Sequence, residues 1–198
     1  MDSARSSAQR SAASTKIVIA GGFGVGKTTL VGSVSEIQPL RTEALVTNES
    51  EGVDDLAAVP SKATTTVAMD FGRITLADDL VLYLFGTPGQ RRFWFMWDDL
   101  CLGAIGAIVL VDTARLDEAF SPLDYFESKG LPFIVAVNQF EGTERYTLDQ
   151  VANALALPAD VPIIDIDARD RESAKRALVR VTEYALQRLT ESLSARVI

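Results

Sequence analysis

The octapeptide GGFGVGKT, residues 21–28, is the strongest indication of fold in this 198-residue chain. It matches the pattern G-x-x-x-x-G-K-[ST], in which glycines turn backbone N–H groups toward phosphates and the lysine neutralises their charge. A β-branched run at residues 16–20 precedes it, and residues 28–36 have a helical pattern. A strand, a glycine-rich loop and a helix in this order predict a phosphate-binding loop at a helix N-terminus.

Composition narrows the classes of function. The net charge of −8 at pH 7 makes the chain a poor partner for nucleic acid. Histidine is absent, so any metal would be held by oxygen atoms, which suits Mg²⁺. The single cysteine, Cys101, rules out an internal disulfide and fits a reducing compartment. Since no apolar run is long enough for an intrinsic membrane span, we expect a cytoplasmic protein, peripheral to a membrane only through partners.

The apolar runs predict one domain, residues 15–198, after a flexible arm, residues 1–14, that is rich in Ser, Ala and Arg. Strand-like and helical runs alternate, which predicts an α/β fold with a mostly parallel sheet and helices on both faces. We expect one antiparallel strand, because the short segment 77–79 joins two strands as a hairpin. The six predicted strands are residues 16–20, 66–76, 80–85, 104–111, 131–137 and 161–166.

The helical runs are separated from one another by strands and turns. A long acidic segment without periodicity, about residues 38–65, is predicted to be a loop, and loops of this length are usually functional. The aromatic run RRFWFMW, residues 91–97, predicts either an exposed partner surface or packing beneath that loop. The predicted helices are residues 28–36, 91–102, 116–129, 148–155 and 171–194.

Four further segments accompany the octapeptide: TVAMDF at 66–71, LFGTPGQ at 84–90, NQFE at 138–141 and DAR at 167–169. With it they resemble the small Ras-like GTPases, and most closely the prokaryotic MglA-like group, whose actinobacterial members are paired with Roadblock-type regulators. The resemblance implies a P-loop NTPase fold and a GTP-binding molecular switch with slow hydrolysis. It implies GTP or GDP and Mg²⁺ as cofactors, and a Roadblock-type regulator and a sensor-kinase-like protein as partners.

The resemblance gives each residue of the loop a role. Lys27 corresponds to the lysine that reaches the β- and γ-phosphates, and Thr28 to the hydroxyl that holds Mg²⁺. A backbone cradle needs only N–H groups, so the Phe23 side chain can point outward, where it would crowd the catalytic water and slow hydrolysis. The other nucleotide-binding positions are Gly22, Gly24, Val25, Gly26 and Thr29.

The segments after the long loop supply the switch residues. Thr66 corresponds to the threonine that contacts Mg²⁺ and the γ-phosphate, with Thr65 as the alternative. Gly89 corresponds to the glycine whose N–H meets the γ-phosphate, and Gln90 to the residue that orients the attacking water. The implied catalytic residues are therefore Gln90, Lys27 and Thr66.

Base recognition is implied by the last two segments. Asn138, Gln139 and Glu141 stand where the family has N-K-x-D, so a carboxylate one methylene longer than usual would read guanine. Ala168 and Arg169 stand where the family has the loop whose backbone contacts the guanine oxygen.

The sequence departs from the family pattern at the metal site. Gly86 occupies the position of the usual Mg²⁺-associated aspartate, and Asp70 or Asp112 could replace it through a water. Two alternatives to a GTP-operated switch remain open, and the first follows from such departures. One is a nucleotide-bound interaction module with little or no hydrolysis. The other is a metabolic ATPase or kinase, which would need a lid with arginines, whereas the acidic segment 38–62 has Arg41 as its only arginine.

Overall fold

A seven-stranded sheet organises the chain in the computed structural model, which describes residues 13–38, 40–47, 64–89 and 91–195. The strand order is β2-β3-β4-β1-β5-β6-β7. Strand β3 runs antiparallel to both of its neighbours, and the other pairs are parallel. The predicted mixed α/β sheet with one antiparallel strand is therefore confirmed. The strands are β1 (Ala13–Gly21), β2 (Leu40–Thr47), β3 (Thr64–Ala77), β4 (Leu80–Gly86), β5 (Gly106–Val111), β6 (Phe133–Asn138) and β7 (Ile163–Ile166).

Strand β2 corrects the prediction of six strands and of a loop that starts near residue 38. It pairs antiparallel with β3, from Leu40 opposite Phe71 to Thr47 opposite Thr64. A strand at the edge of a sheet is made by its hydrogen bonds to a distant neighbour, and this segment has too little periodicity to reveal it locally. The rest of the predicted loop that precedes β3, residues 48–63, lies outside the described residues, as do residues 1–12 of the predicted arm.

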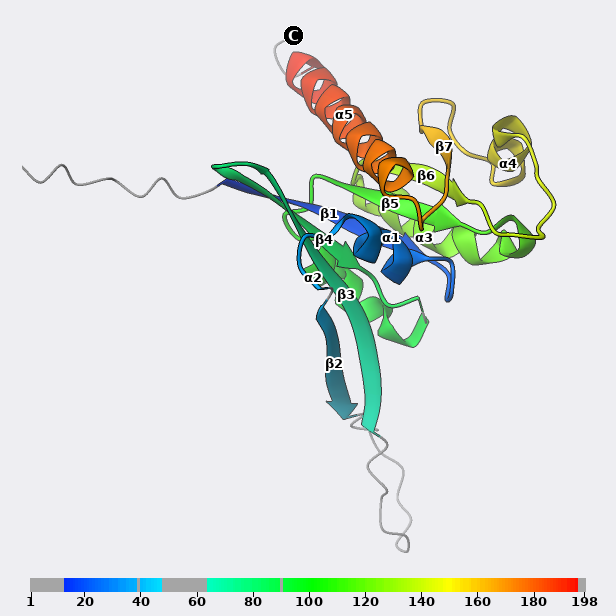
Figure 1. Cartoon of the computed structure of the whole chain (residues 1–198). Helices are drawn as coiled ribbons and strands as arrows, with labels where there is room; N and C mark the ends of the chain where they lie inside the picture. The colour runs from blue at the N-terminus through cyan, green and yellow to red at the C-terminus, as the bar shows by residue number, and fades with distance from the viewer. Residues whose placement is uncertain (1–12, 39, 48–63, 90, 196–198) are drawn as a thin grey trace, which may run out of the picture.

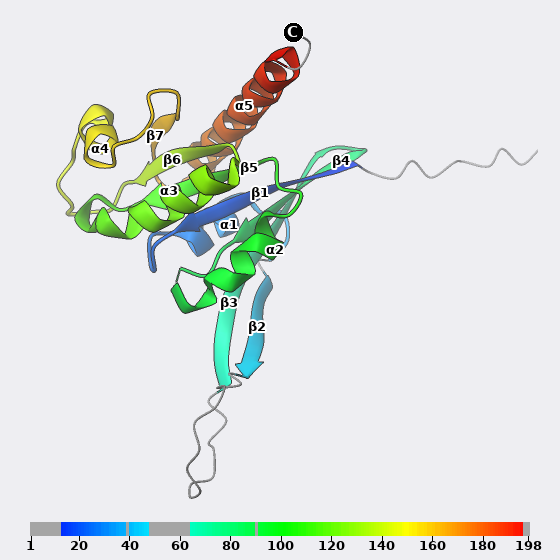
Figure 2. The same ribbon diagram turned by 180° about the vertical axis from the view of Figure 1, so that it is seen from behind.

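Helices cover both faces of the sheet. Figure 1 shows α1 and α5 on the near face, and Figure 2 shows α2 and α3 on the opposite face. Each face has its own apolar core: Leu30 and Val181 belong to the first, and Leu123 and Phe126 to the second. The helices are α1 (Lys27–Val34), α2 (Trp97–Cys101), α3 (Asp117–Lys129), α4 (Leu148–Ala154) and α5 (Arg171–Ala195).

The aromatic run is partly buried and partly exposed, and its buried Trp97 packs against Phe126 of α3. It forms a 3₁₀ helix, Arg91–Met96, followed by the short α2, in place of the single helix expected at residues 91–102. Phe93 and Trp97 are buried, whereas the side chain of Phe95 is exposed. Trp97 donates from Nε1 to the carbonyl of Pro88, at 3.3 Å, so its burial also anchors the turn after β4.

The sheet places the sequence motifs at one edge. In a doubly wound sheet, ligands bind beyond the carboxyl ends of the parallel strands. Strands β1, β4, β5, β6 and β7 all end at this edge, so the octapeptide, the turn after β4, Asn138 and the segment after Ile166 lie together. The neighbourhood of these segments is therefore set by topology alone.

Candidate functional site

The octapeptide forms a turn that only glycines can make. Gly21, Gly24 and Gly26 have φ values of 135°, 75° and 105°, in the left-handed region that other residues rarely adopt. A Cβ atom at Gly26 would lie 2.6 Å from Nδ2 of Asn138. Gly26 also precedes α1 and provides no side-chain cap, so the first N–H groups of that helix are available to an anion.

Lys27 brings a positive charge into the turn. Its side chain is buried, and Nζ donates to the carbonyl oxygens of Gly21 at 2.9 Å and of Gly22 at 2.6 Å. Burial lowers the pKa of Lys27 to about 8, and the carboxylates of Asp70 and Glu118 oppose that shift. The ammonium is thus held on the carbonyls of the loop, where a bound polyphosphate would compensate its desolvation.

Asp70 is the carboxylate that the structure places at the predicted metal position. Thr28 donates from Oγ1 to Oδ2 of Asp70 at 2.6 Å, and Asp70 is buried. Asp70 lies opposite Gly86 in the β3–β4 register, and a Cβ at Gly86 would come within 3.1 Å of its Oδ2. Glycine at this position therefore makes room for the aspartate of the neighbouring strand. A hydroxyl and a carboxylate side by side are oxygen ligands that suit Mg²⁺.

Asp112, the other candidate that the sequence left open, has a different role. Its Oδ1 accepts from the N–H of Ala114 and so caps the 3₁₀ helix Thr113–Arg115. Its Oδ2 pairs with Arg115 at 3.0 Å. Both carboxylate oxygens are therefore engaged away from Thr28. In the described part of the chain, groups of three or more His, Cys, Asp or Glu side chains that could hold a metal are not found.

The two predicted switch segments differ in what the structure shows of them. A Cβ at Gly89 would lie 2.8 Å from Nζ of Lys27 and 3.0 Å from the carbonyl oxygen of Gly22, so only glycine fits against the loop. Gln90 lies outside the described residues. Thr66 is paired with Leu45 inside the β2–β3 ladder, which carries its backbone roughly 13 Å along the strand from Asp70. The Thr28 hydroxyl contacts Asp70 and not Thr66, and a shared metal site of Thr28 and Thr66 stays a prediction.

Asn138 joins two parts of the candidate site. We call the octapeptide, with Asp70 and Gly89, its phosphate side, and residues 138–141 and 167–169 its base side. It is buried, its Nδ2 donates to the carbonyl of Val25 at 3.0 Å, and its Oδ1 accepts from the N–H of Ala168 at 3.0 Å. The backbone N–H of Gln139 donates to the carbonyl of Ile166 at 2.8 Å. One amide side chain therefore fixes the octapeptide, the end of β6 and the segment after β7 relative to one another.

Glu141 and Arg169 form an exposed ion pair on the base side. Nη1 of Arg169 lies 2.8 Å from Oε1 of Glu141, and Nη2 lies 2.9 Å from Oδ2 of Asp167. Hydrogen bonds from Arg169 lower the pKa of Asp167, and the two carboxylates raise the pKa of Arg169. The side chain of Glu141 is 86% exposed. The carboxylate predicted to read a base is thus accessible and held by a neighbouring cation.

Two residues beside the octapeptide were not among the predicted site residues. Nη1 of Arg115 donates to the carbonyl of Phe23 at 2.8 Å, and the carboxylate of Glu118 occupies the space that a Cβ at Gly22 would need. The Phe23 side chain points outward and is 67% exposed, as predicted. The position of Arg115 and Glu118 just after β5, at the edge where the motifs gather, is the signal that could have found them.

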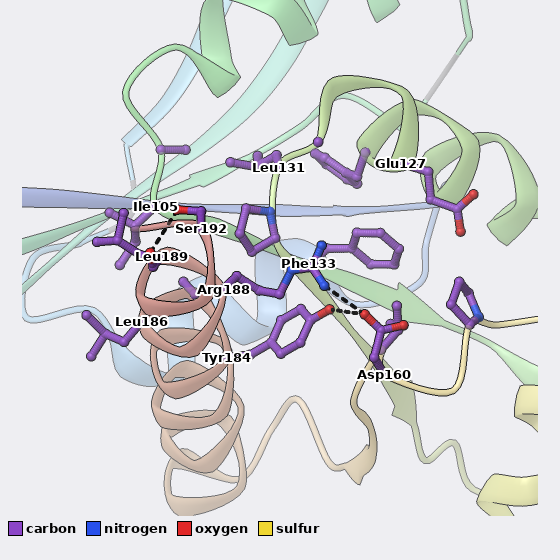
Figure 3. Close-up of a pocket in the computed structure, with 17 residues that line it drawn as sticks. Ile105, Glu127, Leu131, Phe133, Asp160, Tyr184, Leu186, Arg188, Leu189 and Ser192 are labelled. Carbon is purple, nitrogen blue, oxygen red and sulfur yellow. Dashed lines mark hydrogen bonds and ion pairs between the residues drawn. The ribbon is translucent and has the colours of Figure 1, made fainter. Parts of the chain in front are cut away.

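A larger cavity lies elsewhere on the described part of the molecule. Figure 3 shows this cavity, of about 630 Å³, between α5 and the segments that lead into β6 and β7. Asp160 in its wall accepts from Arg188 at 2.9 Å and from Tyr184 at 3.3 Å. A smaller cavity of about 390 Å³ adjoins Gly22, Phe23 and Gly89. We assign the functional site by its convergent polar groups and not by size, because the larger cavity contains none of the motifs.

Among the described residues, none of the helices combines the length and the apolar character that a membrane span requires.

Comparison with known proteins places the chain among nucleotide-binding relatives. Residues 19–188 match the family model described as "Conserved hypothetical ATP binding protein". The chain is 31% identical, over 126 residues, to an uncharacterised protein of Methanocaldococcus jannaschii, covering 63% of this chain and 69% of that protein. It is 26% identical to the Ras-related protein Rab-7b of Homo sapiens over 90% of this chain and 89% of the relative.

The same fold occurs in the G domains of two FeoB proteins. The domain of the T. maritima FeoB iron transporter superposes with a TM-score of 0.59 at 16% identity, covering 87% of this chain and 99% of that one. The FeoB G domain of Methanococcus jannaschii gives a TM-score of 0.56 at 14% identity, covering 87% and 98%. At such identities the likeness concerns the fold alone. Because the family model spans most of the chain, the protein belongs to the family of conserved hypothetical ATP-binding proteins, and its fold is the P-loop NTPase fold of G domains.

Proposed function

We propose that the protein is a GTP-binding molecular switch that hydrolyses GTP slowly. The observation that carries this proposal is the buried Lys27 ammonium inside a glycine turn, beside the Thr28–Asp70 pair. Together these groups provide a cation for the phosphates and two oxygen ligands for a metal. When bound, Mg²⁺ would neutralise phosphate charge, with Thr28 and Asp70 as the residues that hold it.

Guanine is the base that the site favours. A carboxylate accepts two hydrogen bonds from the N1–H and N2–H groups of guanine, whereas adenine offers no such pair of donors. Glu141 is exposed at the end of β6 and is oriented by Arg169. The similarity to Rab-7b supports the same choice, although the description of the family names ATP. The relative affinity for the two bases is therefore the first quantity to measure.

Slow hydrolysis follows from the surroundings of the γ-phosphate position. The exposed Phe23 lines the same small cavity as the half-buried Gly89, so its phenyl ring would crowd an approaching water or a partner's side chain. We further propose that the chain belongs to the MglA-like group and that it regulates a bacterial signalling complex. Its partners would be a Roadblock-type regulator and a sensor-kinase-like protein that recognise the segments next to Gly89.

The test is equilibrium binding of GDP and of non-hydrolysable GTP and ATP analogues, each with and without Mg²⁺. Guanine nucleotides are expected to bind at least about tenfold more tightly than the ATP analogue, because only guanine satisfies the carboxylate. Lys27→Met should lower guanine nucleotide affinity by roughly a hundredfold or more, since it removes a charge-assisted contact to two phosphates. Lys175→Met, on the exposed surface of α5, is the matched control and should change nothing.

The outcomes separate the competing functions. Wild-type protein that binds no nucleotide, or a Lys27→Met variant that binds as well as wild type, would overturn the proposal. Tighter binding of the ATP analogue would make the protein an adenine nucleotide-binding one. Bound GTP that releases no phosphate in a single-turnover assay would favour the alternative of a nucleotide-bound interaction module without hydrolysis.

A further inference from the structure

Arg115, the last residue of the 3₁₀ helix that precedes α3, contacts the middle of the predicted phosphate-binding loop. Its Nη1 donates to the carbonyl oxygen of Phe23 at 2.8 Å, across 92 positions of sequence. This contact joins the segment after β5 to the octapeptide after β1, and those two strands are neighbours in the sheet. A charged donor on a backbone carbonyl makes a stronger hydrogen bond than a neutral one.

The guanidinium of Arg115 is itself held in a fixed orientation. Its Nε and Nη2 donate to the same carboxylate oxygen of Asp112, at 3.1 and 3.0 Å. Asp112 is in turn fixed, because its other oxygen caps the N–H of Ala114. Glu118 lies 3.5 Å from Nη1 on the remaining side. The guanidinium of Arg115 is thus hydrogen-bonded on two sides, to the carboxylate of Asp112 and to the carbonyl of Phe23.

Fixing the Phe23 carbonyl also fixes the next N–H group. The peptide bond is planar and trans, so the N–H of Gly24 points in the direction opposite to the carbonyl of Phe23, away from Arg115. Gly24 has a φ of 75°, a conformation in which successive N–H groups form a concave, anion-binding nest. The carboxylate of Glu118, in the first turn of α3, lies against Gly22, so a second contact from the segment after β5 borders this turn.

We infer that Arg115 is a positioning residue for phosphate binding: by holding the carbonyl of Phe23 outward, it presents the N–H of Gly24 to the bound phosphates. This inference rests on the proposed function, since it assumes that the loop binds a nucleotide. Arg115 itself does not contact the nucleotide; it acts only through the loop. The expected consequence is that loss of Arg115 weakens binding of the distal phosphates and leaves the base side unchanged.

The experiment compares GDP with GMP, which keeps the base and one phosphate, in wild-type protein and in Arg115→Gln. The variant should bind GDP about tenfold more weakly and GMP within about twofold of wild type. A purely structural role would instead lower the melting temperature of the nucleotide-free protein and weaken both ligands alike. Arg180→Gln, which removes an arginine from an exposed ion pair on α5, is the matched control.

Arg115→Lys sharpens the test, because lysine keeps the charge but cannot bridge Asp112 and the Phe23 carbonyl together. It should recover less than about half of the loss in binding free energy, and full recovery would show that charge alone matters and overturn the inference. An unchanged ratio of GDP to GMP affinity in Arg115→Gln would overturn it as well. Wild-type protein that binds neither nucleotide would refute the proposed function instead. If Arg115→Gln does not fold, the ratio of GDP to GMP affinity is measured in Arg115→Lys instead. A ratio equal to that of the wild type would then overturn the inference.

Discussion

The phosphate side and the base side of the candidate site are built on different physical principles. On the phosphate side Lys27 and Asp70 are buried, and their partners are backbone carbonyls or a neighbouring hydroxyl. On the base side, Glu141 and Arg169 pair on the surface, and both are more than half exposed. Charges in a desolvated setting interact strongly and tolerate little change, whereas exposed pairs are screened by water and salt. Phosphate binding should thus be rigid, and base selectivity adjustable.

The first way to break this comparison is to remove the residue that joins both sides. Asn138→Ala leaves the carbonyl of Val25 and the N–H of Ala168 without their buried partner. Because unsatisfied buried groups are costly, the free energy of unfolding should fall by about 2–4 kcal/mol. Urea unfolding of the nucleotide-free protein measures the loss. Asn153→Ala, at an exposed position on α4, should cost less than about 0.5 kcal/mol.

A small effect of Asn138→Ala, equal to that of Asn153→Ala, would show that the two sides are not joined through this amide. The free energy of unfolding of the wild-type protein would then have to be explained by backbone contacts such as the one between Gln139 and Ile166.

The second test uses pH to probe the buried charge. Folding lowers the pKa of Lys27 from 10.5 to about 8, a shift equivalent to roughly 3 kcal/mol. Between these values the unfolded chain binds more protons than the folded one, so stability rises with pH across this window. Below about pH 8 Lys27 is charged in both the folded and the unfolded chain, so the full cost of burying its ammonium is present. Wild-type protein should therefore gain up to roughly 3 kcal/mol relative to Lys27→Met between pH 8 and 10.5, measured by urea unfolding without nucleotide.

The same titration predicts the pH dependence of binding. Phosphates require the charged lysine, so nucleotide affinity should fall as pH rises above about 8, the pKa of Lys27 in the free protein. Parallel stability curves for wild type and Lys27→Met, or an affinity that stays constant from pH 7 to pH 9, would contradict a desolvated ammonium in the loop.

The third test concerns the metal side of the phosphate loop. Asp70→Asn keeps the size of the side chain and an oxygen for the Thr28 hydroxyl, but removes the negative charge. The gain in GTP affinity that Mg²⁺ produces should fall about tenfold, because carboxylates are the preferred protein ligands of this ion. Isothermal titration with and without Mg²⁺ measures it, with Asp165→Asn on the exposed part of β7 as the control. An unaltered response to Mg²⁺ would exclude Asp70 from the metal site.

The smallest effect is expected on the base side. Arg169→Ala frees the Glu141 carboxylate, and the ratio of GTP to ATP affinity should change by about threefold, less at high salt than at low salt. Competition binding at two salt concentrations measures this ratio. A tenfold change that salt does not reduce would mean that the pair is desolvated in the nucleotide complex, and the contrast between the two sides would disappear.

Local signals predicted much of this structure because they are strong and short in range. The octapeptide combines glycines with left-handed φ values and a lysine, and the helices at residues 116–129, 148–155 and 171–194 were predicted to within a residue or two at each end. By contrast, β2 was missed because only its pairing with β3 makes it a strand. The contact of Arg115 was missed because its partner is a backbone carbonyl, that of Phe23, and only the position of Arg115 just after β5 could have indicated it.

By itself, the sequence determined that a glycine turn with a lysine would follow a buried strand, since backbone conformation and helix N-termini depend on neighbouring residues. It also determined the alternation of strands and helices, and hence the edge at which the motifs meet. Only the tertiary structure decided that Asp70 and not Asp112 stands beside Thr28, that Asn138 joins the two sides, and that Arg115 reaches the loop. Those choices depend on strand register and on contacts between segments far apart in the chain, which local pattern cannot specify.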